Sequence, residues 1–86
     1  MITEAQISNT GILLGVYAGM AAGNQAHAEH VTAAMSAFKK KEYTIAASRL
    51  SKLPVSIHKK VGNTQIATSE RKFVPEIHAV CSHYWK

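Results

Sequence analysis

The side chains best suited to chemistry in this sequence are ten lysines and arginines, all of which follow residue 38. Residues 1–38 contain two glutamates and no cation, so their formal charge is −2. Residues 39–86 contain ten cations against three glutamates, so their formal charge is +7. Such an asymmetry is typical of a surface that meets phosphate groups or an acidic protein. The sequence therefore predicts a small basic protein whose partner is nucleic acid or an acidic protein surface.

A second chemical set consists of histidines and the single cysteine. His27 and His30 lie three residues apart, as do His78 and Cys81, and His83 follows closely. Structural zinc sites usually use two or more cysteines on short loops, whereas these pairs fall within expected helices. A cysteine–histidine pair can form a thiolate nucleophile, but pairs at this spacing often arise by chance. We therefore predict no metal site and no cofactor, and leave the metal affinity of these five residues open.

Enzyme motifs are otherwise missing from the chain. It contains no glycine-rich phosphate loop, no paired set of carboxylates and no Ser-His-Asp order. The sequence accordingly predicts a binding protein and not an enzyme.

Length and composition favour one small domain over residues 1–86. The single Cys81 fits a reducing compartment, which predicts a cytoplasmic protein. The apolar run 11–23 is shorter than the roughly 20 residues that span a bilayer. It is preceded by Glu4 and no cation, unlike a secretory signal. We therefore expect no membrane partner.

A first helix is predicted from about residue 4 to residue 22, because Thr3 and Gln6 have the spacing of a capping box. The helix contains a ladder of glycines at every fourth position: Gly11, Gly15, Gly19 and Gly23. Each internal glycine costs about 0.8–1 kcal/mol relative to alanine. The ladder therefore predicts close approach of another helix, either the domain's own second helix, which we favour, or a second copy in a homo-oligomer. The third alternative is that the glycines cut the helix short.

Two further helices are expected before Pro54. Apolar residues follow helical spacing from Val31 to Phe38 and again from Tyr43 to Leu53, but the two stripes differ in phase. The phase break at residues 39–42 predicts a tight turn between a helix over 25–40 and a third helix that ends before Pro54.

Residues 55–68 alternate apolar with polar side chains around Gly62-Asn63, which favours a β-hairpin. The alternative is a short helix over 55–61 followed by a loop, because Ile57 and Val61 are also four residues apart. Pro75 opens a closing helix. The predicted fold is thus mostly α, with a three-helix core and a C-terminal helix, and becomes α+β if the hairpin at 55–68 forms.

This order of elements over residues 25–70 resembles a winged helix-turn-helix domain. In that resemblance, residues 31–38 are the first helix of the motif, 44–53 the recognition helix and 56–68 the wing. It implies a helix in the DNA major groove and a wing on the backbone or minor groove.

The polar face of residues 44–53 supplies candidate contacts to nucleic acid. Arg49 is suited to bidentate contact with guanine, while Ser48 and Lys52 are suited to phosphates. The complete candidate set is Lys39, Lys40, Lys41, Thr44, Ser48, Arg49, Lys52, Lys59 and Lys60.

The alternative function is a non-enzymatic protein-binding module or inhibitor, of the kind found among small basic proteins of phages and mobile elements. Its basic half would dock on an acidic protein surface. Self-association through the glycine ladder is compatible with either function.

Overall fold

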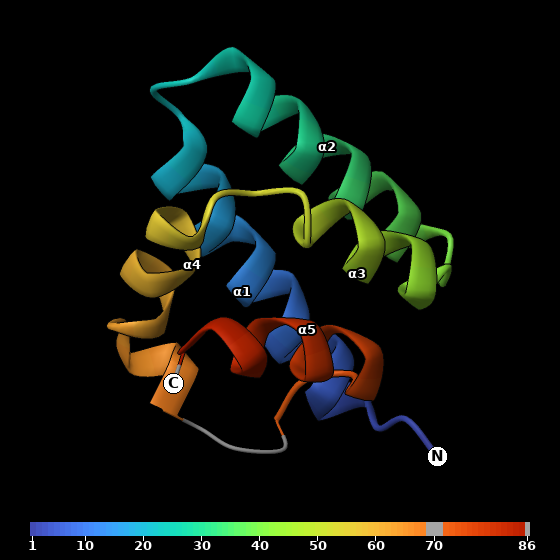
Figure 1. Ribbon diagram of the computed structural model, residues 1–86. Helices are drawn as coiled ribbons and strands as arrows, with labels where there is room; N and C mark the ends of the chain where they lie inside the picture. The colour runs from blue at the N-terminus through green and yellow to red at the C-terminus, as the bar shows by residue number, and fades with distance from the viewer. Residues whose placement is uncertain (69–71, 86) are drawn as a thin grey trace.

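Five α-helices and one short 3-10 helix form the computed structural model, which describes residues 1–68 and 72–85 (Figure 1). The elements are α1 (Glu4–Ala21), α2 (Gln25–Lys39), α3 (Tyr43–Leu50), α4 (Val55–Gly62), η1 (Gln65–Thr68) and α5 (Pro75–Trp85). No strand occurs in the described ranges. The prediction of a mostly helical protein is therefore confirmed, in an all-α form.

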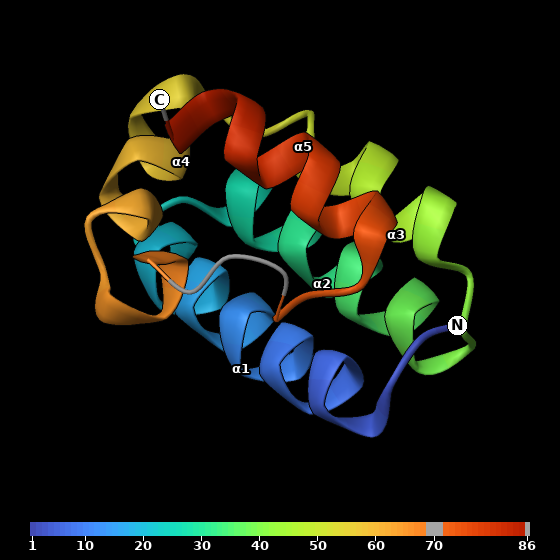
Figure 2. The same cartoon turned by 90° about the horizontal axis from the view of Figure 1, so that it is seen from below.

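Successive helices fold back on one another around a shared interior. α2 returns along α1, and α3 returns along α2 (Figure 1). Seen from below, α1 and α5 lie on opposite sides of the molecule (Figure 2). This arrangement leaves one long side of α1 and one of α3 directed to solvent.

Local signals at the helix ends explain where α1 and α2 begin. The Thr3 hydroxyl accepts a hydrogen bond of 3.1 Å from the Gln6 backbone N–H, and the Gln6 side chain accepts one of 2.8 Å from the Thr3 N–H. The Asn24 side chain accepts a bond of 3.2 Å from the His27 N–H. Both caps satisfy backbone donors that lack helical partners. The capping box predicted from the sequence is thus confirmed.

The large side chains of the core come from all five helices and from the segment just before α5, and many small ones come from α2 and α3. Its fully buried members include Leu13, Leu14, Tyr17, Val31, Ala34, Ala46, Leu50, Phe73, Val74, Ile77 and Cys81. Alanines at the facing positions of α2 and α3 keep those two helices close together, because small side chains permit short interaxial distances.

The hairpin predicted over residues 55–68 is wrong, and the helical alternative is confirmed. α4 occupies Val55–Gly62, and η1 follows at Gln65–Thr68. The helix buries Ile57, His58 and Val61 together, whereas alternation along a strand would have put the first two on opposite faces. Packing against α1 and α5 thus overrides β-branched propensity. The wing implied by the winged helix-turn-helix resemblance is consequently not formed.

The glycine ladder packs differently from the favoured prediction. Only Gly11 meets α2, where an added Cβ atom would lie 3.9 Å from Phe38. Added Cβ atoms at Gly15, Gly19 and Gly23 would meet nothing within 4 Å. The glycines also do not shorten α1, which continues to Ala21. Leu13, Leu14, Tyr17 and Ala21 of α1 face the core, so most of the ladder is left on the outer side.

No helix in the described residues combines the length and apolar character needed to cross a bilayer.

Candidate functional site

The outer face of α3 carries the polar residues that the sequence assigns to nucleic acid. Ala46, Ala47 and Leu50 point into the core. Thr44, Ser48 and Arg49 of α3 are exposed, as is Lys52 just beyond its end. The helix is therefore cleanly divided into a buried face of small apolar side chains and an exposed face of hydroxyl and cationic groups.

Ile45 also lies on this exposed face, which the sequence reasoning missed. Its side chain is 49% exposed. Arg49 follows it by four residues, a spacing that places both on one side of α3. The available signal was that an isoleucine stands outside the apolar stripe of its own helix.

The turn between α2 and α3 adds three exposed lysines next to the start of α3: Lys39, Lys40 and Lys41. Lys41 has a positive φ of 63°, the one such value for a non-glycine in the described ranges. The Glu42 N–H donates to the Ala37 carbonyl at 2.9 Å, and the Lys41 N–H donates to the Phe38 carbonyl at 2.9 Å. These two bonds form a Schellman motif, whose left-handed position usually holds glycine.

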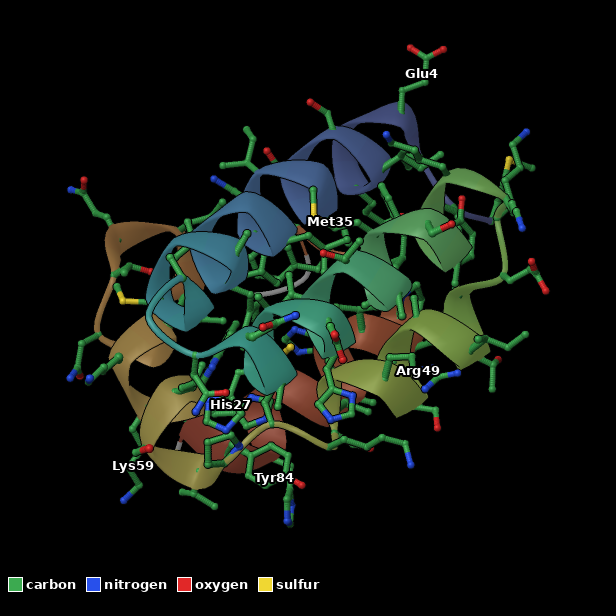
Figure 3. All side chains as sticks on the ribbon, turned by 90° about the horizontal axis from the view of Figure 1, so that it is seen from above. Glu4, His27, Met35, Arg49, Lys59 and Tyr84 are labelled. Carbon is green, nitrogen blue, oxygen red and sulfur yellow. The ribbon has the colours of Figure 1, made fainter. Side chains whose placement is uncertain are left out.

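Lys59 and Lys60 occupy the exposed side of α4, opposite its buried residues. α4 lies at one side of the molecule and the α2–α3 turn at the other (Figure 1), and the molecule measures 34 × 26 × 17 Å. In Figure 3, Arg49 and Lys59 extend outward at separate places. The candidate cations are therefore distributed across the molecule and do not form one compact cluster.

The positive charge of this surface has no ion-pair partner among the residues that the structure describes. All eight lysine and arginine residues of the described ranges are exposed, and none of those side chains forms an ion pair. Exposed cations without partners remain available to an external anion.

A buried polar cluster joins α1, α4 and α5. The Tyr17 hydroxyl lies 2.8 Å from His58 Nδ1 and donates to Cys81 Sγ at 3.2 Å. The ring of Tyr84 stacks on His58 with a centroid distance of 4.1 Å. The side chains of Tyr17, His58 and Cys81 are fully buried. The side chains of Tyr17, His58 and Cys81 are therefore shielded from solvent, and the cluster connects three helices internally.

Burial controls the ionisation of this cluster. It raises the pKa of Cys81 to about 11, although the hydrogen bond from Tyr17 opposes this shift. It raises the pKa of Tyr17 as well. Burial lowers the pKa of His58, and the backbone of Leu50 opposes that shift. At neutral pH Cys81 is a thiol and not a nucleophilic thiolate.

The metal-capable residues noted in the sequence are not brought together. His27 and His30 belong to α2, and His78, Cys81 and His83 belong to α5. Within residues 1–68 and 72–85, no group of three or more histidine, cysteine or carboxylate side chains has a geometry that could hold a metal ion.

Comparison with known proteins adds no relative to this picture. A scan of protein-family models found none that matches the chain, and searches of curated proteins and of solved structures found no match either.

Proposed function

We propose that the protein binds nucleic acid, with the outer face of α3 toward the bases and the lysines of the α2–α3 turn and α4 toward backbone phosphates. The observation that carries this proposal is the exposed, unpaired positive charge of these elements. Phosphate contacts of this type supply affinity and orientation, whereas side chains that reach base edges supply specificity.

The dimensions of α3 support the assignment of its role. An α-helix such as α3 is about 10–12 Å in diameter with its side chains. The major groove of B-DNA is about 12 Å wide and admits an α-helix. The exposed face offers Arg49 for a guanine and Thr44 and Ser48 as shorter hydrogen-bonding groups. α4 takes the position in the chain that the resemblance gave to a wing, and its Lys59 and Lys60 suit phosphates.

The conformation of Lys41 supports a role for its charge. A non-glycine residue in the left-handed region costs about 1 kcal/mol. Glycine would serve the turn better, so the lysine side chain is not explained by the fold. Residues held in uncommon backbone conformations often serve function.

The experiment is fluorescence anisotropy of labelled duplex DNA and single-stranded RNA over a range of salt concentrations. Each lysine–phosphate contact on B-DNA contributes a slope of about −0.9 to log affinity against log salt. Lys59→Ala should therefore flatten the slope for duplex DNA by about 0.9. Lys72→Ala, which removes the same charge from an exposed residue outside the proposed set, should leave it unchanged. Absence of binding at physiological salt would overturn the proposal.

An acidic protein surface is the second candidate, favoured by one observation. Val55 is 49% exposed at the start of α4 and precedes Lys59 by one turn. Val55 gives this cationic helix an apolar contact of its own, and an acidic protein surface could meet both groups. This function predicts no affinity for nucleic acid at physiological salt, together with capture of a specific acidic partner that Val55→Asp abolishes.

A further inference from the structure

We propose that α3 selects DNA over RNA through Ile45, whose side chain contacts the 5-methyl group of thymine in the major groove. This inference rests on the nucleic-acid function proposed above and identifies the substrate class of the same face. Its starting observation is that Ile45, an apolar side chain 49% exposed, stands on the one face of α3 that otherwise carries polar and cationic groups.

The surroundings of Ile45 distinguish it from Ile12 and Met20, the exposed large apolar side chains of α1. Ile12 and Met20 lie on α1, which has no cation. Ile45 has Arg49 one turn later on the same face of α3, and Lys52 is exposed just beyond the end of the helix. A partner that covers Ile45 must therefore present an apolar group within a strongly negative surface. Charge complementarity and apolar contact are both met by duplex DNA.

The chemistry of the groove identifies the apolar group. Each base pair presents donors and acceptors at the major-groove edge, and thymine adds a methyl group that binds apolar side chains. Uracil lacks this methyl group, and the major groove of A-form RNA is too deep and narrow for side chains to read. A contact through Ile45 is thus available in DNA and not in duplex RNA.

Helix geometry also predicts the spacing of the bases that are read. Residues four apart lie about 6 Å apart along a helix axis, and base pairs stack about 3.4 Å apart. Ile45 and Arg49 would therefore reach bases about two steps apart. We expect a preferred site in which a thymine and a guanine are separated by about that distance.

The test removes the methyl group alone. A random duplex library is enriched on the wild-type protein, and the enriched duplex is then synthesised with thymine or with deoxyuridine. Anisotropy should show roughly fourfold weaker binding of the deoxyuridine duplex for each thymine methyl group that Ile45 covers. Ile45→Ala should bind both duplexes equally, at the level of wild-type protein on deoxyuridine.

Val55→Ala is the matched control, because Val55 is also 49% exposed but lies on α4. It should retain the thymine preference, and circular dichroism should show the same helix content for all three proteins. This inference would be overturned if the wild-type protein bound the two duplexes equally, or if the library failed to enrich. Salt-dependent binding would still support the proposed function in that case. Loss of all binding at physiological salt would instead overturn the proposed function itself.

Discussion

α1 and α3 are both exposed along one side, but the two exposed sides differ in chemistry. The outer side of α1 carries no charged residue from Ala5 to Ala21 and contains Gly15 and Gly19, where an added Cβ atom would meet nothing within 4 Å. The outer side of α3 carries Arg49 and is flanked by lysines. The buried sides of the two helices also differ, because α1 buries large residues and α3 buries mainly alanines. α1 therefore contributes mainly large side chains to the core, whereas α3 presents polar and cationic side chains to solvent.

If this division holds, substitutions in the buried side of α1 should change stability most. Leu13→Ala removes a fully buried side chain and should lower the free energy of unfolding by about 2–5 kcal/mol. Urea denaturation followed by circular dichroism measures the change. The adjacent Ile12 is 55% exposed, and Ile12→Ala should stay within about 0.5 kcal/mol of wild type. Equal losses for the two variants would show that α1 is not seated in the core as described.

The role of α1 in the core can also be tested through the pH dependence of the free energy of unfolding. The pKa of His58, which bonds to Tyr17 of α1, is lowered by burial in the folded protein. The unfolded chain therefore takes up this proton more readily, and stability should fall as pH drops below about 6.5. Urea midpoints at several pH values measure the fall. His58→Asn, which cannot gain the proton, should be less stable but should lose less stability on acidification; an unchanged pH dependence would contradict the assignment.

A substitution in the α2–α3 turn should raise the stability of the fold and weaken DNA binding at the same time. Lys41→Gly relieves a left-handed backbone and should raise the free energy of unfolding by about 1 kcal/mol. The same change removes one phosphate contact, so the salt slope of DNA binding should flatten by about 0.9. Lys40→Ala, without the unusual φ, should flatten the slope with no gain in stability. If Lys41→Gly is more stable but its salt slope is unaltered, the turn does not belong to the interface.

The smallest effect is expected on the outer side of α1. Gly15 lies within the helix, and a Cβ atom there meets nothing within 4 Å. Gly15→Ala should therefore raise the unfolding free energy by about 0.8–1 kcal/mol and leave DNA affinity unchanged. Thermal denaturation at two protein concentrations measures the change. A loss of stability, or a smaller mass in sedimentation, would show instead that another copy of the chain covers this stripe.

Much of the helical layout follows from local sequence signals. Thr3 and Gln6 mark the start of α1, the phase break after Phe38 marks the α2–α3 turn, and Pro75 begins α5. Each of these signals acts between residues a few positions apart, so it can be read without knowledge of the rest of the fold.

The parts that could not be predicted depend on long-range packing. Residues 55–61 fit both a strand and a helix, and the contacts of α4 with α1 and α5 decide between them. The polar cluster joins Tyr17 to partners 41 and 64 positions away in the sequence. Ile45 stands outside the apolar stripe of its helix, but its exposure also depends on how α3 packs on α2 and α5.

If the outer face of α3 binds nucleic acid, its exposed side chains can be changed without a loss of stability. The most direct measurement is the affinity of Arg49→Ala for the enriched duplex, determined alongside its urea midpoint. Arg49 is exposed and unpaired, so we predict that affinity falls by about 1–3 kcal/mol while the midpoint stays at the wild-type value. If Arg49→Ala binds the enriched duplex as tightly as the wild-type protein does and keeps its sequence preference, the proposed role of α3 is contradicted.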